Sequence, residues 1–486
     1  MDKKQSVITN FFWRLMERGG TYVMNFIVSV ILARLLEPSL YGSIALVTAI
    51  TAILQVFVDS GMANSLIQKK DTDDLDYSSV FYFNLVFCLV LYAGLFAAAP
   101  MIGRLYHDES LVPVVRVLGL TIVVSGVKNV QQAYVAKTMQ FRRFFFATLG
   151  GTIFSAIVGI TLAYLGKGVW ALVFQQLLNV TVNTAILWLT VGWRPKPIFS
   201  WERLKTLISY GWKLLVSQLL DTAYLKLYQF IIGLRYSTAD LAFYNRAEQF
   251  PLLITENTSS ALDSVLLPVL SSEQDDPARV REMTRRAVKV STYILMPLMA
   301  GLAACAVPLV RLLLTAKWLP CVPFLQIFCI YYAFFPVHTA NLNAIKAVGR
   351  SDVFLRLEII KKLLETAVLL FTVRIGVFAM ALGQLFCGVA SLLINAWPNR
   401  RLLGYPYRQQ LRDVLPVLAL SLVMAACVWP VTLLGLHDAL TLLIQIPLGV
   451  LVYVLGSRLL KLDSFELILS MLRKMLRRGK EASDNG

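Results

Sequence analysis

The chain has 486 residues, of which 57% are hydrophobic and 15% are charged, and its formal net charge at pH 7 is +17. A mean hydropathy of +0.65 is too high for a water-soluble enzyme. The basic excess lies between apolar stretches, which argues against a nucleic-acid-binding surface. The composition therefore predicts a protein that is largely embedded in a membrane.

Apolar stretches of membrane-spanning length fill most of the chain, because a span needs about 20 apolar residues. We predict fourteen spans, at residues 11–36, 40–66, 78–103, 113–135, 144–165, 168–191, 210–234, 240–270, 288–314, 320–345, 353–373, 376–397, 412–435 and 438–460. The predicted fold class is an all-α integral membrane protein with about 14 transmembrane helices. An even number of spans puts both chain ends on one side of the membrane.

Basic residues gather in alternate connections between the predicted spans. The connections that are rich in basic residues include Lys69-Lys70, Arg142-Arg143, Arg285-Arg286 and Arg400-Arg401. Such connections stay in the cytoplasm, so both termini are predicted to be cytoplasmic. No cleavable signal peptide is expected, because Arg14 and Arg18 interrupt the first apolar run.

The sequence contains no recognisable catalytic or metal-binding motif. Its six cysteines and three histidines are scattered, without the close spacing of metal ligands. No phosphate-binding loop, dinucleotide fingerprint or nucleophile elbow occurs. We therefore expect no metal, no bound cofactor and no catalytic residues.

The chain repeats itself at a shift of about 200 residues. The segment Gly168-Val169-Trp170-Ala171-Leu172, followed by Gln176, matches Gly376-Val377-Phe378-Ala379-Met380, followed by Gln384. Arg34, before Leu40-Tyr41, matches Arg235, before Leu241 and Tyr244. Each half then has six spans and keeps the same orientation, which is typical of parallel repeats in transporters.

The repeat and the charge pattern divide the chain into five segments. These are a first lobe at 1–195, a cytoplasmic interfacial linker at 196–209, a second lobe at 210–400, two extra spans within 401–462 and a basic amphipathic cytoplasmic tail at 463–486. Phe199, Leu204, Leu207 and Ile208 predict a short helix on the membrane surface, with an ordinary loop as the alternative. The tail is predicted to lie on anionic lipid.

Four predicted spans carry polar residues at helical spacing, so that each forms one stripe. The stripes are Arg14, Arg18, Thr21, Asn25 and Ser29; Thr48, Thr51, Gln55 and Asp59; Lys213, Ser217, Asp221, Tyr224 and Tyr228; and Asn245, Gln249, Glu256, Ser260 and Asp263. Glu365 is a further acid, within span 353–373. A charge at mid-bilayer costs about 2.5–3.5 kcal/mol, so the stripes should face water or one another. They predict a transporter with a polar lumen at the seam between the lobes.

Simpler interpretations of these residues stay open. An isolated charge can pair with a neighbour and fix helix packing. Arg14 and Arg18 can extend to the cytoplasmic headgroups. The hydroxyls of Thr48 and Thr51 can bond to carbonyls of their own helix.

Several motifs resemble the bacterial polysaccharide flippases. They are Ala33-Arg34-Leu35-Leu36-Glu37-Pro38-Ser39-Leu40-Tyr41-Gly42, Asp59-Ser60-Gly61 with Ile67-Gln68-Lys69-Lys70, Gly168-Val169-Trp170-Ala171-Leu172-Val173, Tyr244-Asn245-Arg246-Ala247, Lys317-Trp318 and Gly349-Arg350-Ser351-Asp352. The group that they resemble most is the O-antigen and teichuronic-acid type within the multidrug, oligosaccharidyl-lipid and polysaccharide exporter superfamily. The resemblance covers about residues 8–400.

The resemblance implies a V-shaped pair of six-helix lobes in the bacterial inner membrane. It implies a flippase that moves undecaprenyl-pyrophosphate-linked oligosaccharide repeat units from the cytoplasmic to the outer leaflet by alternating access. The product would feed surface polysaccharide biosynthesis. A monomer is expected, with a polysaccharide polymerase and glycosyltransferases as partners and no nucleic acid.

On this hypothesis the polar residues take three roles. The expected pyrophosphate contacts are Arg14, Arg18, Arg34, Lys213 and Arg246, and the expected sugar contacts are Asn25, Gln55, Asn245 and Gln249. Asp59, Asp221, Glu256, Asp263 and Glu365 are lumen acids that could couple transport to protons or sodium ions.

Three rival functions stay open. A cation-coupled multidrug exporter of the same superfamily would favour an acidic and aromatic lumen, which the lumen cations oppose. A lipid-II-type peptidoglycan precursor flippase would suit fourteen spans. A membrane glycosyltransferase or polymerase would need a large extramembrane loop, and the longest predicted cytoplasmic loop, at 271–287, is too short for a domain.

Overall fold

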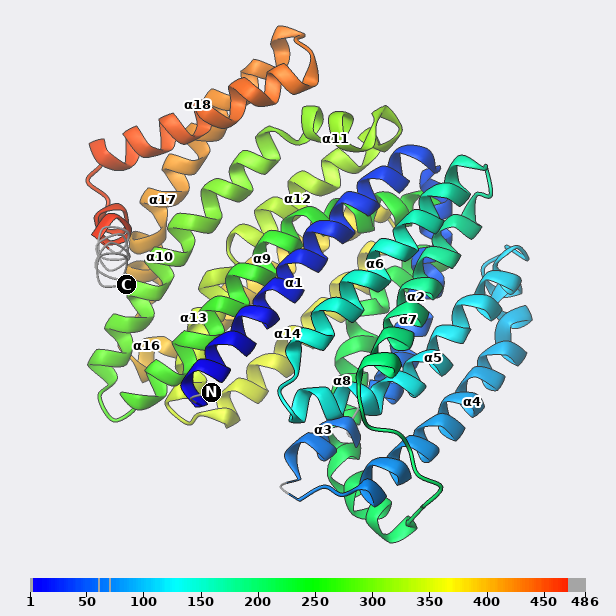
Figure 1. Ribbon diagram of the computed structural model, residues 1–486. Coiled ribbons are helices and arrows are strands. Elements are labelled where there is room, and N and C mark those ends of the chain that lie inside the picture. Colours follow the sequence, from blue (N-terminus) through cyan, green and yellow to red (C-terminus); the bar gives the residue numbers. More distant parts are fainter. Residues whose placement is uncertain (1–2, 60–61, 70, 471–486) are drawn as a thin grey trace. The chain divides into compact units, whose positions relative to one another are not determined.

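The computed structural model describes residues 3–59, 62–69 and 71–470, and every regular element in these residues is a helix (Figure 1). The predicted all-α class is therefore confirmed. The chain forms two compact units, Met1–Ala242 and Phe243–Gly486.

Ten helical segments of the described chain are long and apolar enough to cross a membrane, which confirms a multi-pass membrane protein. Four further helices have 22 to 35 residues: α1 (Lys3–Leu35), α8 (Trp201–Arg235), α9 (Thr238–Ser272) and α14 (Ser351–Thr372). They fall on the predicted spans that carry charges, which explains their lower hydropathy. The count of fourteen spans stays a prediction.

The first unit is a bundle of long helices. It contains α1, α2 (Pro38–Asp59), α3 (Met62–Gln68), α4 (Asp74–Leu105), α5 (Leu111–Lys137), α6 (Phe141–Tyr164), α7 (Val169–Thr190) and α8. Pro38 starts α2, because proline is preorganised for the first helical position and lacks only an unused N–H. The pairs α6–α7, α4–α5 and α1–α6 pack along their lengths (Figure 1).

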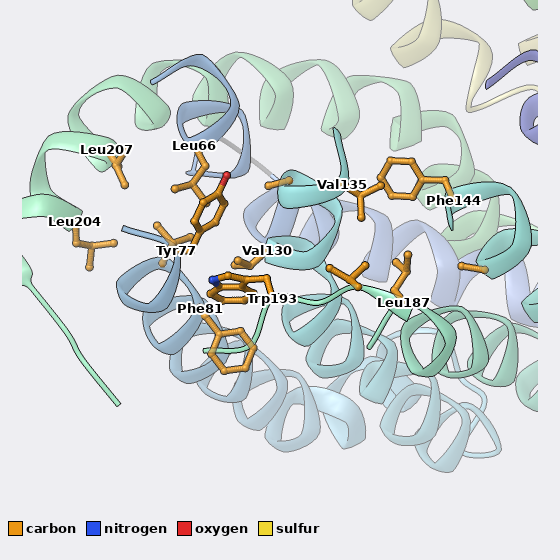
Figure 2. Close-up of a cluster of buried hydrophobic side chains, with 14 residues drawn as sticks. Leu66, Tyr77, Phe81, Val130, Val135, Phe144, Leu187, Trp193, Leu204 and Leu207 are labelled. Carbon is orange, nitrogen blue, oxygen red and sulfur yellow. The ribbon is translucent and has the colours of Figure 1, made fainter. Parts of the chain in front are cut away.

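The start of α8 belongs to the core of this unit. The sequence predicted a short surface helix followed by a separate span, but residues 201–235 form one continuous helix. The Ser200 hydroxyl caps its N-terminus by accepting a hydrogen bond from the Arg203 backbone N–H. Leu204 and Leu207 are buried against α3 and α4, and the Ser65 hydroxyl donates to the Leu207 carbonyl at 3.1 Å (Figure 2). Leu204 and Leu207, which the sequence assigned to the membrane surface, therefore pack on protein, whereas Phe199 of the same predicted face is exposed.

Trp193 holds the connection before α8 in place. Its ring centroid lies 5.5 Å from that of Tyr77 and 6.5 Å from that of Phe81, inside the cluster drawn in Figure 2. Its indole N–H donates to the Asp74 carboxylate at 3.2 Å, and its carbonyl accepts from the Gln131 amide at 3.1 Å. The chain that joins the two sequence repeats is thus fixed to the first unit.

A buried carboxylate fastens the same region. Asp76 is fully buried, and its side chain lies 2.5 Å from the Lys69 ammonium and 3.7 Å from the Arg203 guanidinium. It also closes a capping box with Asp73 at the start of α4. One carboxylate therefore joins α3, α4 and α8.

The second unit consists of shorter and more broken helices. It contains most of α9, then α10 (Pro277–Ala304), α11 (Ala306–Leu314), the 3-10 helix η1 (Ala316–Cys321), α12 (Val322–Ala333), α13 (Phe335–Ala347), α14, α15 (Val377–Ala396), α16 (Asn399–Leu402), α17 (Tyr407–Val428), the 3-10 helix η2 (Trp429–Leu434) and α18 (Asp438–Leu459). The predicted span 320–345 is divided between α12 and α13. Pro336 lies in the first turn of α13, where its missing N–H does no harm.

The two extra helices α17 and α18 pack on α10 (Figure 1). Arg285 of α10 holds Asp413 of α17 through two hydrogen bonds of 2.5 and 2.7 Å, and Tyr405 donates to the same carboxylate at 3.0 Å. The Tyr293 hydroxyl of α10 donates to the Ser457 hydroxyl of α18 at 2.8 Å. These polar contacts attach the extra helices to the second unit.

The repeated motifs fall at equivalent helix boundaries. Arg34 lies in the last turn of α1, and Arg235 lies in the last turn of α8. Gly168 precedes α7 and Gly376 precedes α15, with φ of +55° and +154°. Glycine adopts such positive φ angles without the steric cost that a side chain would bring.

We expect that Asp76→Ala destabilises the protein by about 1–3 kcal/mol, because it removes the buried carboxylate that accepts from the Lys69 ammonium and from the Asp73 N–H. The measurement is the thermal unfolding midpoint of the purified protein in detergent. Glu109→Ala is the control, since Glu109 is exposed in the same unit. Equal midpoints for the two variants would show that the buried carboxylate does not stabilise this region.

We also expect that Gly42→Ala is harmful. A Cβ atom at Gly42 in α2 would lie 1.7 Å from the Thr238 carbonyl oxygen, so the backbone would have to move. Overpacking of this kind costs about 1–3 kcal/mol. Gly94→Ala should be neutral, because nothing lies within 4 Å of its Cβ position. A Gly42→Ala protein as stable as Gly94→Ala would contradict the close approach.

Candidate functional site

A polar cavity of about 810 Å³ opens inside the first unit, among helices α1, α2, α3, α5, α6 and α7. Its size falls within the range of about 300–1,000 Å³ that is typical of small-molecule sites. The five long helices of this set all lie on predicted spans, so the cavity is polar space within the part of the chain that is predicted to be membrane-embedded.

Carboxamide side chains dominate the polar lining, and we call the space the amide cavity. Its carboxamides are Asn25 on α1, Gln55 on α2, Asn129 and Gln132 on α5, and Gln175, Gln176 and Asn179 on α7. Each carboxamide offers both donors and acceptors, as a sugar hydroxyl does. The cavity can therefore bind a molecule that is rich in hydroxyl groups.

Two charged side chains, Asp59 and Lys128, also line the amide cavity. The Gln55 amide donates to the Asp59 carboxylate at 3.0 Å. The two charges act on each other, but neither side chain forms an ion pair with the other in the described chain. The cavity wall therefore carries the Asp59 and Lys128 side chains without an ion pair between them.

The structure brings together part of the predicted first-lobe stripes. Asn25, Gln55 and Asp59 all line the amide cavity, as do Thr48 and Thr51. The two threonine hydroxyls donate to carbonyls of their own helix, at 3.0 Å to Ala45 and 3.2 Å to Thr48. Back-bonding therefore accounts for these hydroxyls.

Other predicted residues of the first unit lie elsewhere or are not described. Arg34, at the end of α1, and Asp221, on α8, are exposed and do not line the amide cavity. The side chains of Arg14, Arg18 and Lys213 in this unit, and of Asp263 in the second, lie outside the described part of the structure.

In the second unit, Arg246 is a packed cation with a specific geometry. Its side chain is 7% exposed, its guanidinium lies 5.1 Å from the ring centroid of Trp318, and it donates to the Gln249 carboxamide at 2.9 Å. Asn245 is half-buried beside it, and Gln249 is exposed. The structure therefore brings these three predicted residues to one stretch of α9.

The predicted acids of the second unit are dispersed. Glu256 is exposed on α9. Glu365 is half-buried on α14, with its carboxylate 3.5 Å from the Lys362 ammonium. An acid that we did not predict, Glu248, accepts a hydrogen bond from the Tyr332 hydroxyl at 3.1 Å. In the described residues no three His, Cys, Asp or Glu side chains form a metal-binding group.

Sequence analysis missed half of the amide cavity. Lys128, Asn129 and Gln132 lie on the predicted span 113–135, and Gln175, Gln176 and Asn179 lie on 168–191. Their signal was present as polar side chains four residues apart, which share a helix face. The sequence prediction placed the lumen on the first two spans of each lobe, so it did not include these two spans.

Comparison with known proteins places the chain among polysaccharide exporters. Residues 31–323 match the family described as polysaccharide biosynthesis protein. The chain is 24% identical to the succinoglycan biosynthesis transport protein ExoT of Rhizobium meliloti strain 1021, over 72% of this chain and 71% of that protein. It is 22% identical to the lipopolysaccharide biosynthesis protein WzxC of Escherichia coli strain K12, over 84% of each.

Solved structures of two transporters share the fold. The lipid II flippase MurJ in an inward closed conformation aligns with a TM-score of 0.73 and 15% identity, over 93% of this chain and 98% of MurJ. A multidrug resistance MATE transporter in an inward-facing conformation aligns with a TM-score of 0.59 and 15% identity, over 79% of this chain and 95% of that one. At such identities the likeness shows the fold alone.

We expect water-borne reagents to reach the amide cavity. In a Cys427→Ser background, which removes the exposed native cysteine, Gln132→Cys and Gln175→Cys should react with a charged thiol reagent applied to open membrane fragments. Val90→Cys, on the exposed apolar face of α4, and Leu118→Cys, which is buried, are the controls and should not react. Labelling is read by mass shift, and unreactive cavity cysteines would show that the cavity is dry.

Proposed function

The chain belongs to the polysaccharide biosynthesis protein family, and from this premise we propose that it is a flippase for lipid-linked oligosaccharides. The predicted resemblance to bacterial polysaccharide flippases is confirmed by the family match and by the relatives. The protein is a membrane transporter and not an enzyme.

The proposed substrate is an undecaprenyl-pyrophosphate-linked oligosaccharide repeat unit, moved from the cytoplasmic to the outer leaflet for surface polysaccharide biosynthesis. Its sugars and pyrophosphate cannot cross hydrocarbon unaided, since an isolated ion in a dry low-dielectric medium costs tens of kcal/mol. A polar path through the protein would remove most of this barrier, while the lipid tail stays in the bilayer.

The observation that carries the proposal is the amide cavity. Seven carboxamides line polar space inside membrane-spanning helices. Polar groups are costly in a membrane and mark function there. A cationic or apolar drug would make little use of carboxamide donors and acceptors, whereas the hydroxyl groups of a sugar can pair with Gln132, Gln175 and Gln176, which make no hydrogen bond to described residues. In this proposal, Asn25 and Gln55 of the first unit form hydrogen bonds with sugar hydroxyl groups. Asn245 and Gln249 have the same role in the second unit.

The pyrophosphate would be passed between basic residues. We assign its reception from the cytoplasm to Arg14, Arg18 and Lys213, and its delivery to the outer leaflet to Arg34 and Arg246. Arginine suits this task because its planar fork can hold phosphate through two hydrogen bonds. Rocking of one repeat against the other would then alternate access, as in transporters built from repeats.

Energy coupling and surroundings complete the proposal. Asp59, Asp221, Glu256, Asp263 and Glu365 are the acids that could bind a coupling proton or sodium ion, and no other cofactor is proposed. We place both termini in the cytoplasm of a bacterial cell, on the inner membrane, following the basic connections. The protein would act as a monomer, beside a polysaccharide polymerase and glycosyltransferases.

The two rival transport functions differ from this one in their cargo. A multidrug exporter would change the drug tolerance of its host, and a lipid-II-type flippase would rescue cells depleted of their peptidoglycan precursor flippase. Neither result is expected here. A strain that lacks the gene should instead lose its surface glycan and accumulate lipid-linked repeat units.

We expect that Arg246→Ala and Arg14→Ala each abolish glycan export when they complement such a strain. Loss of a charged hydrogen-bonding group costs about 1.5–3 kcal/mol, or roughly 10- to 150-fold in transport. Surface glycan is measured by immunoblot at matched membrane levels of the protein. Arg374→Ala is the matched control, because Arg374 is exposed at the end of α14. Normal glycan in both test variants would remove the pyrophosphate relay from the proposal.

A further inference from the structure

A pocket of about 260 Å³ lies in the second unit, between the start of α10 and the helical segment that residues 463–470 form after α18. Three cations of α10 line it, Arg285, Arg286 and Lys289. The basic connections predict that this end of α10 is cytoplasmic, and the predicted span 288–314 begins beside these residues. The pocket is therefore expected at the level of the lipid headgroups.

Lys289 ties the segment after α18 to α10 through two polar contacts. Its ammonium donates to the Asp463 carboxylate at 2.9 Å, and its carbonyl accepts from the Ser464 hydroxyl at 3.2 Å. The Asp463 side chain is 82% exposed, so water and salt screen this ion pair and make it weak. Another anion can therefore take the place of Asp463 on Lys289.

The pocket also offers guanidinium groups with free donors. Arg286 makes no ion pair or hydrogen bond to any residue that the structure describes, and Glu282, one turn before it, is exposed. Arg285 binds the Asp413 carboxylate through Nε and Nη2, at 2.5 and 2.7 Å. Its Nη1 group makes no hydrogen bond within the described chain and keeps both of its N–H donors. Such planar donor groups suit a phosphate.

The pocket is lined by apolar side chains as well. Val290, one turn after Arg286 on α10, and Leu467 of the segment after α18 contribute to its wall. A soluble phosphate would gain nothing from these side chains, whereas the glycerol and the first acyl carbons of a phospholipid would remove them from water. Guanidinium donors beside an apolar wall therefore favour the phosphate of a lipid over a soluble phosphate.

We propose that this pocket binds the phosphate group of an anionic phospholipid from the cytoplasmic leaflet, through Arg286, the Nη1 group of Arg285 and Lys289. The phosphate replaces Asp463 on Lys289, and the lipid contacts both α10 and the segment 463–470. This inference goes beyond the proposed function and holds whether or not the chain carries oligosaccharides. It makes the protein sensitive to the lipid composition of its membrane.

The test uses the full-length protein in detergent, with bound lipid measured by native mass spectrometry over a titration. The probes are dioleoyl phosphatidylglycerol, which is anionic, dioleoyl phosphatidylcholine, which carries a compensating positive charge, and glycerol 3-phosphate, which lacks acyl chains. The variants are Arg286→Gln and Asp463→Asn. Their matched controls are Arg400→Gln and Glu466→Gln, because both residues are exposed and lie outside the pocket. Thermal unfolding without added lipid shows whether each variant is folded.

We expect Arg286→Gln to weaken binding of phosphatidylglycerol roughly 5-fold, the effect of one basic residue near an anionic headgroup. Asp463→Asn should strengthen this binding, because the phosphate no longer competes with a carboxylate for Lys289. Phosphatidylcholine and glycerol 3-phosphate should bind more weakly than phosphatidylglycerol. The two control variants should bind like the unmodified protein.

Two outcomes would overturn the inference. Equal effects of Arg286→Gln and Arg400→Gln would show that lipid is held by diffuse charge, such as that of Arg473 and Lys474 in the tail sequence. Glycerol 3-phosphate that binds as tightly as phosphatidylglycerol would show that the pocket takes a soluble phosphate.

Crosslinking in vesicles locates the bound lipid. A phosphatidylglycerol with a photoreactive group beside its phosphate should label peptides that contain residues 282–290 and 463–470. Arg286→Gln should reduce this labelling, and Arg400→Gln should leave it unchanged. Labelling that avoids these peptides, or that Arg286→Gln does not reduce, would place the lipid elsewhere and refute the site.

Discussion

The cost of a polar group in hydrocarbon is the constraint from which the rest of this structure follows. Each charge or amide in a membrane span must find water, a partner or a ligand. In the second unit, Arg285 holds Asp413, and the Lys361 ammonium lies 2.6 Å from the Glu358 carboxylate. In the first unit, Lys128, Gln132 and Gln175 instead line an open cavity and make no ion pair or hydrogen bond to described residues. The same physical rule thus separates packing residues from residues that await a ligand.

Much of the fold was readable from the sequence because hydropathy alone reports membrane spans. Apolar length and the charge pattern predicted the helical class, and the predicted spans 412–435 and 438–460 correspond to α17 and α18. What hydropathy could not report is tertiary packing. The apolar residues Leu204 and Leu207 fit a membrane surface as well as a protein core, and only neighbours such as Ser65 decide between them.

The candidate site shows the same limit. The stripe of α2 was found because Gln55 and Asp59 are four residues apart on one face, and both line the amide cavity. Lys128 and Gln132 have the same spacing, yet one lysine in an apolar span does not reveal which helices enclose it. Whether such a residue is paired is a property of the assembled helices. Lys361 forms an ion pair with Glu358, whereas Lys128 lines the cavity without one, and the sequence alone could not show this difference.

The compact first unit extends one helix beyond the first sequence repeat. The repeat ends after α7, whereas the unit continues through α8, whose Leu204 and Leu207 complete its core. Without the start of α8, the buried cluster that contains Leu66 would lose Leu204 and Leu207. The join between copies is for this reason a structural part of the molecule and not a tether that can be cut or lengthened freely.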